Sequence, residues 1–288
     1  MAKSRTECPI PSGILVVVGG KENKGAKEAS EKETPREFER LEILKDFVGL
    51  TGKKNPVIEV VTSASSEGKA SFEEYRSAFE KLGVHKTGHI HHSNRKQVLD
   101  DTLEERIQAA DGVFFSGGDQ LKLTALYGGT HLLTRLKERY IYDKIVIGGT
   151  SAGAMALSTP MIYAGNKEVE ELGGEIKITT GLEFMKDVCI DTHFINRGRF
   201  VRMAQVVVTN PTCIGMGIGE DTAIVVKNGL EVEVIGSGLV IVMDGFHISE
   251  SNVNEFVEKK PVSIKDLKVH ILSTGNTYKV PQINPPHL

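Results

Sequence analysis

One stretch of the sequence indicates both the fold and the chemistry of this chain: KIVIGGTSAGAM, at residues 144–155. The apolar run at 145–147 is typical of a parallel strand covered on both faces, and the two glycines after it end the strand without a side chain to pack. Small residues from Ala152 onward predict a helix. We therefore expect Ser151 on a tight bend, where its hydroxyl projects into a cleft and the next N–H can meet a developing oxyanion.

Residues 149–153 satisfy the spacing G-x-S-x-G of a nucleophile elbow. Serine is also common at strand-to-helix turns because its side chain caps the helix, so the five-residue pattern alone leaves both interpretations open. The buried strand, the double glycine and the small-residue helix each match the context that the motif requires. Ser151 is on these grounds the best candidate nucleophile.

The composition is that of an ordinary globular protein, with 288 residues, 40% hydrophobic, 25% charged and a formal net charge of −3. This charge gives no general attraction to nucleic acid or to anionic membranes, so we expect neither as a partner. No apolar stretch is long enough to cross a membrane, and the N-terminal residues lack the apolar segment of a secretory signal. These features favour a cytoplasmic location.

Neither a metal nor a cofactor is expected. The three cysteines have no C-x-x-C spacing, which argues against a disulfide framework and a zinc site. The histidines in HIHH at 89–92 would point to different faces of a short strand, with no carboxylate near to complete a ligand set. The glycine-rich segment at 19–25 has the wrong spacing for a phosphate loop or a dinucleotide fingerprint.

Strands and helices alternate through the first part of the chain. Strands are expected at 14–18, 57–61, near His89, at 112–115 and at 145–147. Two of the helices between them carry capping boxes at their start, one from Thr34 to Glu37 and one from Ser71 to Glu74. Such alternation implies right-handed crossovers and a mainly parallel sheet.

From about Cys213 the apolar runs become closely spaced, which suggests an antiparallel extension of the same sheet. No Pro- or Ser-rich linker divides the two parts. The sequence therefore predicts the α/β class, with one domain at 13–280 built on a mainly parallel twisted sheet with helices on both faces. Residues 1–12 are expected to form a flexible arm and 281–288 a loose tail.

Two further strand ends carry candidates for a proton relay. The strand at 188–190 runs into His193 at its carboxyl end, where ligands of open parallel sheets bind and where Ser151 also projects. Glu220 follows the apolar run at 213–218 in the same way, with Asp221 beside it as a competitor. The residues alone leave two other interpretations open. His193 could be a buried histidine bonded to a backbone carbonyl, and Glu220 could be a solvated turn carboxylate.

Three arginines, Arg197, Arg199 and Arg202, lie near the start of an expected helix, where cations oppose the helix dipole. An acidic substrate would relieve this conflict, because guanidinium groups bind carboxylates in a bidentate manner. A solvated basic face paired with surface acids is the alternative.

A second glycine pair follows the expected strand at 112–115. Gly118 in this pair lets a backbone N–H approach a ligand closely, so it is a candidate oxyanion donor together with Ala152. Glycine pairs also simply end strands, and the spacing does not decide between the two.

Four collinear segments together resemble a known family: FFSGGDQ at 114–120, GGTSAGA at 148–154, DTHFINRGRFVR at 191–202 and GIGEDTA at 217–223. They are similar to segments of the serine peptidase family that contains the cyanophycinases and dipeptidase E. The resemblance implies a fold like that of class I glutamine amidotransferases. It also implies Ser151 as nucleophile, His193 as general base and later acid, and Glu220 as the carboxylate that orients the histidine.

The cyanophycinase resemblance also implies a substrate, cyanophycin, a polyaspartate whose side-chain carboxylates carry arginine through isopeptide bonds. The product would be the β-aspartyl-arginine dipeptide. Arg197, Arg199 and Arg202 would then hold aspartate carboxylates, while Asp191 and Gln120 would contact the arginine or the backbone of the substrate. The family also suggests a homodimer.

Some points remain open within this resemblance. Thr192 stands where these relatives usually carry glutamine, so the fine substrate contacts are not defined there. A peptidase for small β-aspartyl or N-terminal aspartyl peptides would use the same triad. A non-catalytic binder of acidic peptides could be built on the same scaffold, although it would lack an activated hydroxyl.

Overall fold

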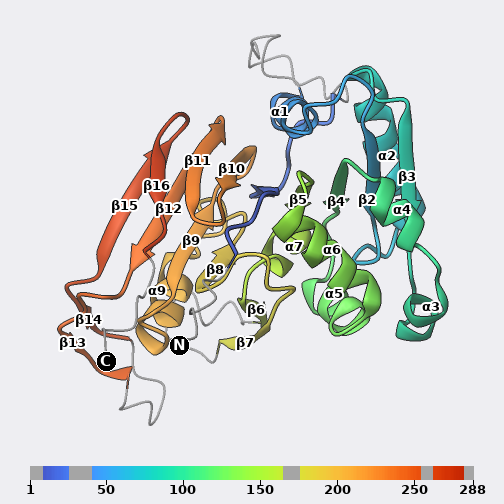
Figure 1. The fold of residues 1–288 in the computed structure, drawn as a ribbon. Helices are drawn as coiled ribbons and strands as arrows, with labels where there is room; N and C mark the ends of the chain where they lie inside the picture. The colour runs from blue at the N-terminus through green and yellow to red at the C-terminus, as the bar shows by residue number, and fades with distance from the viewer. Residues whose placement is uncertain (1–8, 26–40, 165–175, 254–261, 282–288) are drawn as a thin grey trace, which may run out of the picture.

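Strands from along the whole described chain form one eight-stranded sheet, in the order β16-β11-β10-β1-β5-β4-β2-β3 (Figure 1). The computed structural model describes residues 9–25, 41–164, 176–253 and 262–281. The strands of this sheet are β1 (Ile14–Val18), β2 (Val57–Val61), β3 (Lys86–Ile90), β4 (Gly112–Phe115), β5 (Val146–Thr150), β10 (Thr222–Lys227), β11 (Glu231–Gly236) and β16 (Thr277–Lys279). The five strands from β1 to β3 in this order are parallel, and the other three are antiparallel.

Helices cover both faces of this sheet, as predicted. They are α1 (Glu42–Leu50), α2 (Gly68–Lys81), α3 (Arg95–Asp100), α4 (Glu104–Ala109), α5 (Gln120–Tyr127), α6 (His131–Tyr142), α7 (Ala152–Ala156) and α9 (Phe200–Thr209). Alternate strand residues point to opposite faces, so Val16 packs with α1 and α2 while Val17 packs in the cluster that holds α3 to α6. None of the described helices has the length and apolar character needed to span a bilayer.

The C-terminal strands divide between two sheets, which corrects the prediction of one extended sheet. Strands β10, β11 and β16 extend the main sheet, but β9 (Ile214–Ile218), β12 (Leu239–Asp244) and β15 (Lys268–Ser273) join β8 (Val188–Asp191) in a separate four-stranded sheet. Apolar runs such as β9 are buried on both faces, so their pattern marks a strand without marking its partners. The remaining strands of the described residues form two short pairs, β6 (Pro160–Ala164) with β7 (Lys177–Thr180) and β13 (Glu250–Ser251) with β14 (Ile264–Lys265).

Helix starts differ from the capping-box predictions. Helix α2 begins at Gly68, so Ser71 lies within the helix and the prediction that it caps the start is wrong. Gly68 lies close to the ring of His91, since a Cβ there would lie 2.3 Å from Nδ1 and the ring would have to move. The capping box at Thr34 lies outside the described residues, as do 1–8 of the predicted arm and 282–288 of the predicted tail.

Candidate active site

Ser151 lies between β5 and α7 in a backbone conformation that non-glycine residues rarely adopt, with φ 51° and ψ −113°. The glycines on either side are needed because other backbone comes too close for a side chain. A Cβ on Gly149 would lie 2.6 Å from the carbonyl carbon of Gly153, and a Cβ on Gly153 would lie 2.3 Å from the carbonyl oxygen of Phe115. The predicted bend between strand and helix is confirmed, and these contacts explain its G-x-S-x-G spacing.

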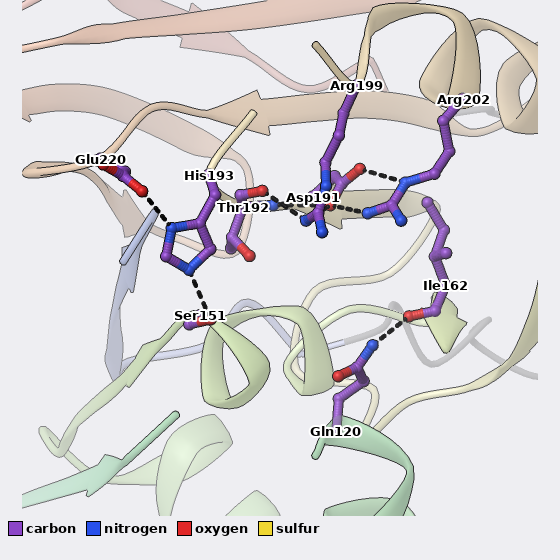
Figure 2. Close-up of polar contacts among 9 residues, drawn as sticks. All are labelled: Gln120, Ser151, Ile162, Asp191, Thr192, His193, Arg199, Arg202 and Glu220. Carbon is purple, nitrogen blue, oxygen red and sulfur yellow. Dashed lines mark hydrogen bonds and ion pairs between the residues drawn. The ribbon is translucent and has the colours of Figure 1, made fainter. Parts of the chain in front are cut away.

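His193 and Glu220 meet Ser151 from two other strand ends (Figure 2). The Ser151 hydroxyl lies 2.9 Å from His193 Nε2, and His193 Nδ1 lies 2.7 Å from Glu220 Oε1. His193 follows β8 and Glu220 follows β9, so three segments distant in sequence meet at the carboxyl ends of their strands. Asp221 is engaged elsewhere, accepting hydrogen bonds from the Asn23 backbone and the Ser237 hydroxyl.

The hydrogen bonds define the tautomer of His193. An ionised Glu220 can only accept, so Nδ1 carries the proton and Nε2 offers its lone pair to the Ser151 hydroxyl. Burial is the main cause that lowers the pKa of His193 below its usual 6.5, and the charge of Arg197 adds to this, while the Glu220 hydrogen bond opposes it. The imidazole is therefore neutral at neutral pH and able to accept a proton.

Glu220 keeps its charge through its neighbours. Burial acts to raise its pKa, but the hydrogen bonds from His193 and from Lys21, whose Nζ lies 3.2 Å from Oε2, hold the pKa below its usual 4.5. Lys21 belongs to the glycine-rich segment after β1, for which the sequence predicts no role in the site. A charged residue in a polar segment gives no sequence signal of such a contact.

The predicted oxyanion donors lie on the two segments around Ser151. Ala152 is the first residue of α7, where a backbone N–H has no acceptor within the helix. The Gly117–Gly118 turn lies against the nucleophile, since a Cβ on Gly117 would lie 3.5 Å from the Ser151 Cβ. Gly118 has φ 139°, and a Cβ there would lie 2.2 Å from the carbonyl oxygen of Ala64. Only glycine fits this position without a shift of the backbone.

Asp191 lies inside the protein with two arginines around it (Figure 2). Its predicted contact with a substrate stays a prediction. Asp191 is 0% exposed and accepts hydrogen bonds from Arg199 Nη1 and Arg202 Nε, both at 2.9 Å. The buried carboxylate of Asp191 thus balances two of the cations near the start of α9. The sequence predicts an acidic ligand for this role. Arg202 is itself buried against Asp191, and its predicted contact with substrate carboxylates stays a prediction.

Of the other predicted substrate contacts, Arg197 is the most open. Its side chain is exposed, and its charge influences His193. Arg199 is largely buried by its bonds to Asp191 and to the carbonyl oxygen of Thr192. Gln120 at the start of α5 donates from Nε2 to the carbonyl oxygen of Ile162 at 2.9 Å.

The histidines at 89–92 bond to hydroxyl and carboxylate groups. The Thr62 hydroxyl lies 2.7 Å from His89 Nε2 and 3.0 Å from His91 Nδ1. His92 lies within 2.9 Å of both the Tyr127 hydroxyl and the Asp101 carboxylate. Among the described residues, no group of His, Cys, Asp or Glu side chains has the geometry to hold a metal ion.

A serine hydroxyl bonded to a histidine and a carboxylate, at the edge of an α/β sheet, is typical of hydrolases that use a serine nucleophile. The chain belongs to peptidase family S51, whose family model matches residues 29–234. It is therefore a serine peptidase. The chain order of Ser151, His193 and Glu220 differs from the order in α/β-hydrolases, where the acid precedes the histidine.

Similarity to curated relatives extends over most of the chain. It is 32% identical over 268 residues to a cyanophycinase of Synechococcus elongatus, covering 93% of this chain and 79% of the relative. It is 30% identical over 264 residues to the cyanophycinase of Geminocystis herdmanii strain PCC 6308, covering 92% of each.

Solved structures share the fold. A peptidase from an acI-B1 Actinobacterium superposes with a TM-score of 0.61 at 21% identity, over 94% of this chain and 98% of the other. A putative peptidase E protein from Listeria monocytogenes EGD-e superposes with a TM-score of 0.50 at 17% identity, over 78% and 99%. Identities this low support the fold alone.

Proposed function

We propose that this chain hydrolyses cyanophycin to β-aspartyl-arginine dipeptides, as an exopeptidase that works through an acyl-enzyme. The substrate class rests on the curated relatives, which are cyanophycinases matching more than nine tenths of the chain. The observation that carries the chemistry is the continuous chain of hydrogen bonds from Ser151 through His193 to Glu220.

In the proposed reaction, His193 Nε2 accepts the proton of Ser151 as the serine oxygen attacks a peptide carbonyl of the polyaspartate. The N–H groups of Ala152 and Gly118 hold the resulting oxyanion. The amine leaves with the proton from His193, and the acyl group stays on Ser151. Water, deprotonated by the same imidazole, then releases the acid and restores the serine.

Substrate recognition centres on Arg197 in this proposal. A cation four residues after His193, with its side chain in solvent, is well placed to meet a carboxylate of the polymer. Arg199 and Gln120 remain candidate contacts, each with part of its hydrogen-bonding capacity used inside the protein. Asp191 and Arg202 are bonded to each other at the two ends of the segment that carries Arg197, and they remain candidate contacts as well.

Replacement of Arg197 by glutamine is expected to raise KM for cyanophycin by about 10- to 100-fold, since a hydrogen bond to a charged group contributes roughly 1.5–3 kcal/mol. The same change removes a positive charge that lowers the pKa of His193, so that pKa rises. The acid limb of the kcat/KM profile should therefore move to higher pH. Arg135→Gln, a change at an arginine of α6 that pairs with Glu138, is the matched control and should alter neither quantity.

Replacement of Gly118 by alanine is expected to lower kcat by about 10²–10³, the usual loss when one oxyanion donor is displaced. The new Cβ would collide with the carbonyl oxygen of Ala64 and turn the N–H away. Gly83→Ala is the control, because Gly83 also has a positive φ but no atom near its Cβ position. A loss of similar size in both variants would mean that backbone strain, and not the donor, is responsible.

Clearing of a cyanophycin suspension by the purified protein tests the substrate directly, with the released product identified by mass. We expect clearing and the mass of β-aspartyl-arginine. If the suspension stays turbid while small β-aspartyl or N-terminal aspartyl peptides are cleaved, the substrate is a small peptide of this kind and not the polymer. Lack of reaction with a serine-directed fluorophosphonate as well would favour a binder of acidic peptides.

The homodimer and the cytoplasmic location stay predictions from the sequence. Light scattering of the purified protein tests the first, since a monomer has the mass of one 31.4 kDa chain.

A further inference from the structure

The segment from Gly19 to Asn23, here called the strap, follows β1 and contacts His193, Glu220 and the neighbouring Asp221. The Gly19 carbonyl accepts from the His193 N–H at 2.8 Å, and the Gly20 carbonyl accepts from the Asp221 N–H at 2.9 Å. Lys21 pairs with Glu220, and the Asn23 N–H donates to the Asp221 carboxylate at 3.2 Å. Five consecutive residues at the end of a strand thus reach both the histidine and the acid.

Gly20 lies directly against the imidazole. Its φ is 102°, and a Cβ there would lie 2.4 Å from His193 Cε1 and 2.6 Å from Nε2. His193 itself has φ 50°, a strained value for a residue with a side chain. The strap therefore holds the backbone of His193 through Gly19 and supports its ring through Gly20.

Glu22 links the strap to the nucleophile. Its carboxylate is only 6% exposed and accepts hydrogen bonds from the hydroxyls of Thr150 and Tyr75. Thr150 is the residue before Ser151, and the Ser151 N–H donates to the carbonyl oxygen of Val18, just ahead of the strap. Burial raises the pKa of Tyr75, and the neighbouring Glu22 charge adds to this, so the phenol remains a donor.

We propose that Glu22 is a positioning residue for the nucleophile, which couples the Ser151 bend to the histidine and acid through the strap. This positioning role extends the proposed peptidase activity and rests on its serine chemistry. Ser151 and His193 both have strained backbones, with φ 51° and φ 50°, and such strain persists only where the surroundings hold it. Glu22 supplies that restraint on the nucleophile side, where a displacement of about 1 Å can cost 10²-fold in rate.

Two variants test this role with a readout that needs no cyanophycin, the rate at which a fluorophosphonate labels Ser151. Glu22→Gln removes the charged acceptor, and Thr150→Val removes the donor with little change of shape. Each is expected to slow labelling and to lower kcat by about 10- to 100-fold with KM unchanged. The double variant should be no slower than Glu22→Gln alone, because both changes break the same contact.

Glu59→Gln is the matched control for the loss of a buried carboxylate. Glu59 lies on β2 of the same sheet, is 4% exposed and binds Arg106. We expect this control to lower the melting temperature while the folded protein is labelled at the wild-type rate. Wild-type labelling in folded Thr150→Val, or additive losses in the double variant, would overturn the role of Glu22. Slow labelling in a protein whose wild type leaves cyanophycin intact would support Glu22 and refute only the substrate.

Discussion

Ser151→Ala is expected to reduce cyanophycin hydrolysis by about 10⁴- to 10⁶-fold, with the fold retained. The hydroxyl is the only group removed, and its oxygen lies 2.9 Å from His193 Nε2. The rest of the site stays in place, so the residual rate reports what the oxyanion donors and substrate binding supply without a nucleophile. Product release measured by mass, with far-UV circular dichroism as the check on folding, gives the result.

Ser158→Ala is the matched control for this loss. Ser158 lies just beyond the other end of α7, and its buried hydroxyl donates to the carbonyl oxygen of Met155. Removing it should lower the free energy of unfolding by about 1 kcal/mol and leave turnover intact. A folded Ser151→Ala protein that still clears the polymer at a substantial rate would show that another group is the nucleophile.

The position of Ser151 could be predicted because its signal is local. A buried strand, two glycines and a helix of small residues are adjacent in sequence, and the close approach of Gly149 to Gly153 explains the glycine at each of these two positions. His193 and Glu220 could be placed by a second local rule, that residues just past apolar strands lie at one edge of the sheet. That rule predicts the edge of the sheet at which the side chains lie, but not the distances between them, which come from the structure.

The partners of the arginines could not be predicted in the same way. Charge at the start of a helix shows that a counter-charge is needed, but not whether a ligand or the protein provides it. Asp191 provides the counter-charge for Arg199 and Arg202. It is the last residue of β8 and is completely buried. A carboxylate at a strand end looks the same in sequence whether it faces solvent or the interior.

The strap and the second sheet were beyond sequence reasoning for a related cause. Glu22 stands among charged residues of a segment that has the composition of a solvated loop, yet it is buried against Tyr75 from a distant helix. Strand β9 has the same apolar pattern whether it pairs with β8 or with the main sheet. Both facts depend on contacts between segments far apart in the chain, which periodicity does not encode.

Glu220→Gln is expected to lower kcat/KM by about 10³–10⁴ while the arrangement of the three side chains is retained. A neutral amide no longer stabilises the imidazolium that forms when His193 takes the serine proton. Its N–H₂ group can also face Nδ1, which would place the imidazole proton on Nε2, where it prevents proton transfer from Ser151. Loss of the carboxylate that raises the pKa of His193 lowers that pKa further.

The pH profile separates this mechanism from a general disturbance of the site. With a lower His193 pKa, the acid limb of kcat/KM for Glu220→Gln should move to lower pH, opposite to the shift expected for Arg197→Gln. Glu233→Gln, an equivalent change in an exposed ion pair with Lys227 on the main sheet, should shift neither rate nor profile. Shifts of the same sign in the Glu220 and Arg197 variants would contradict the assignment of His193 as the titrating base, because the two neighbours carry opposite charges.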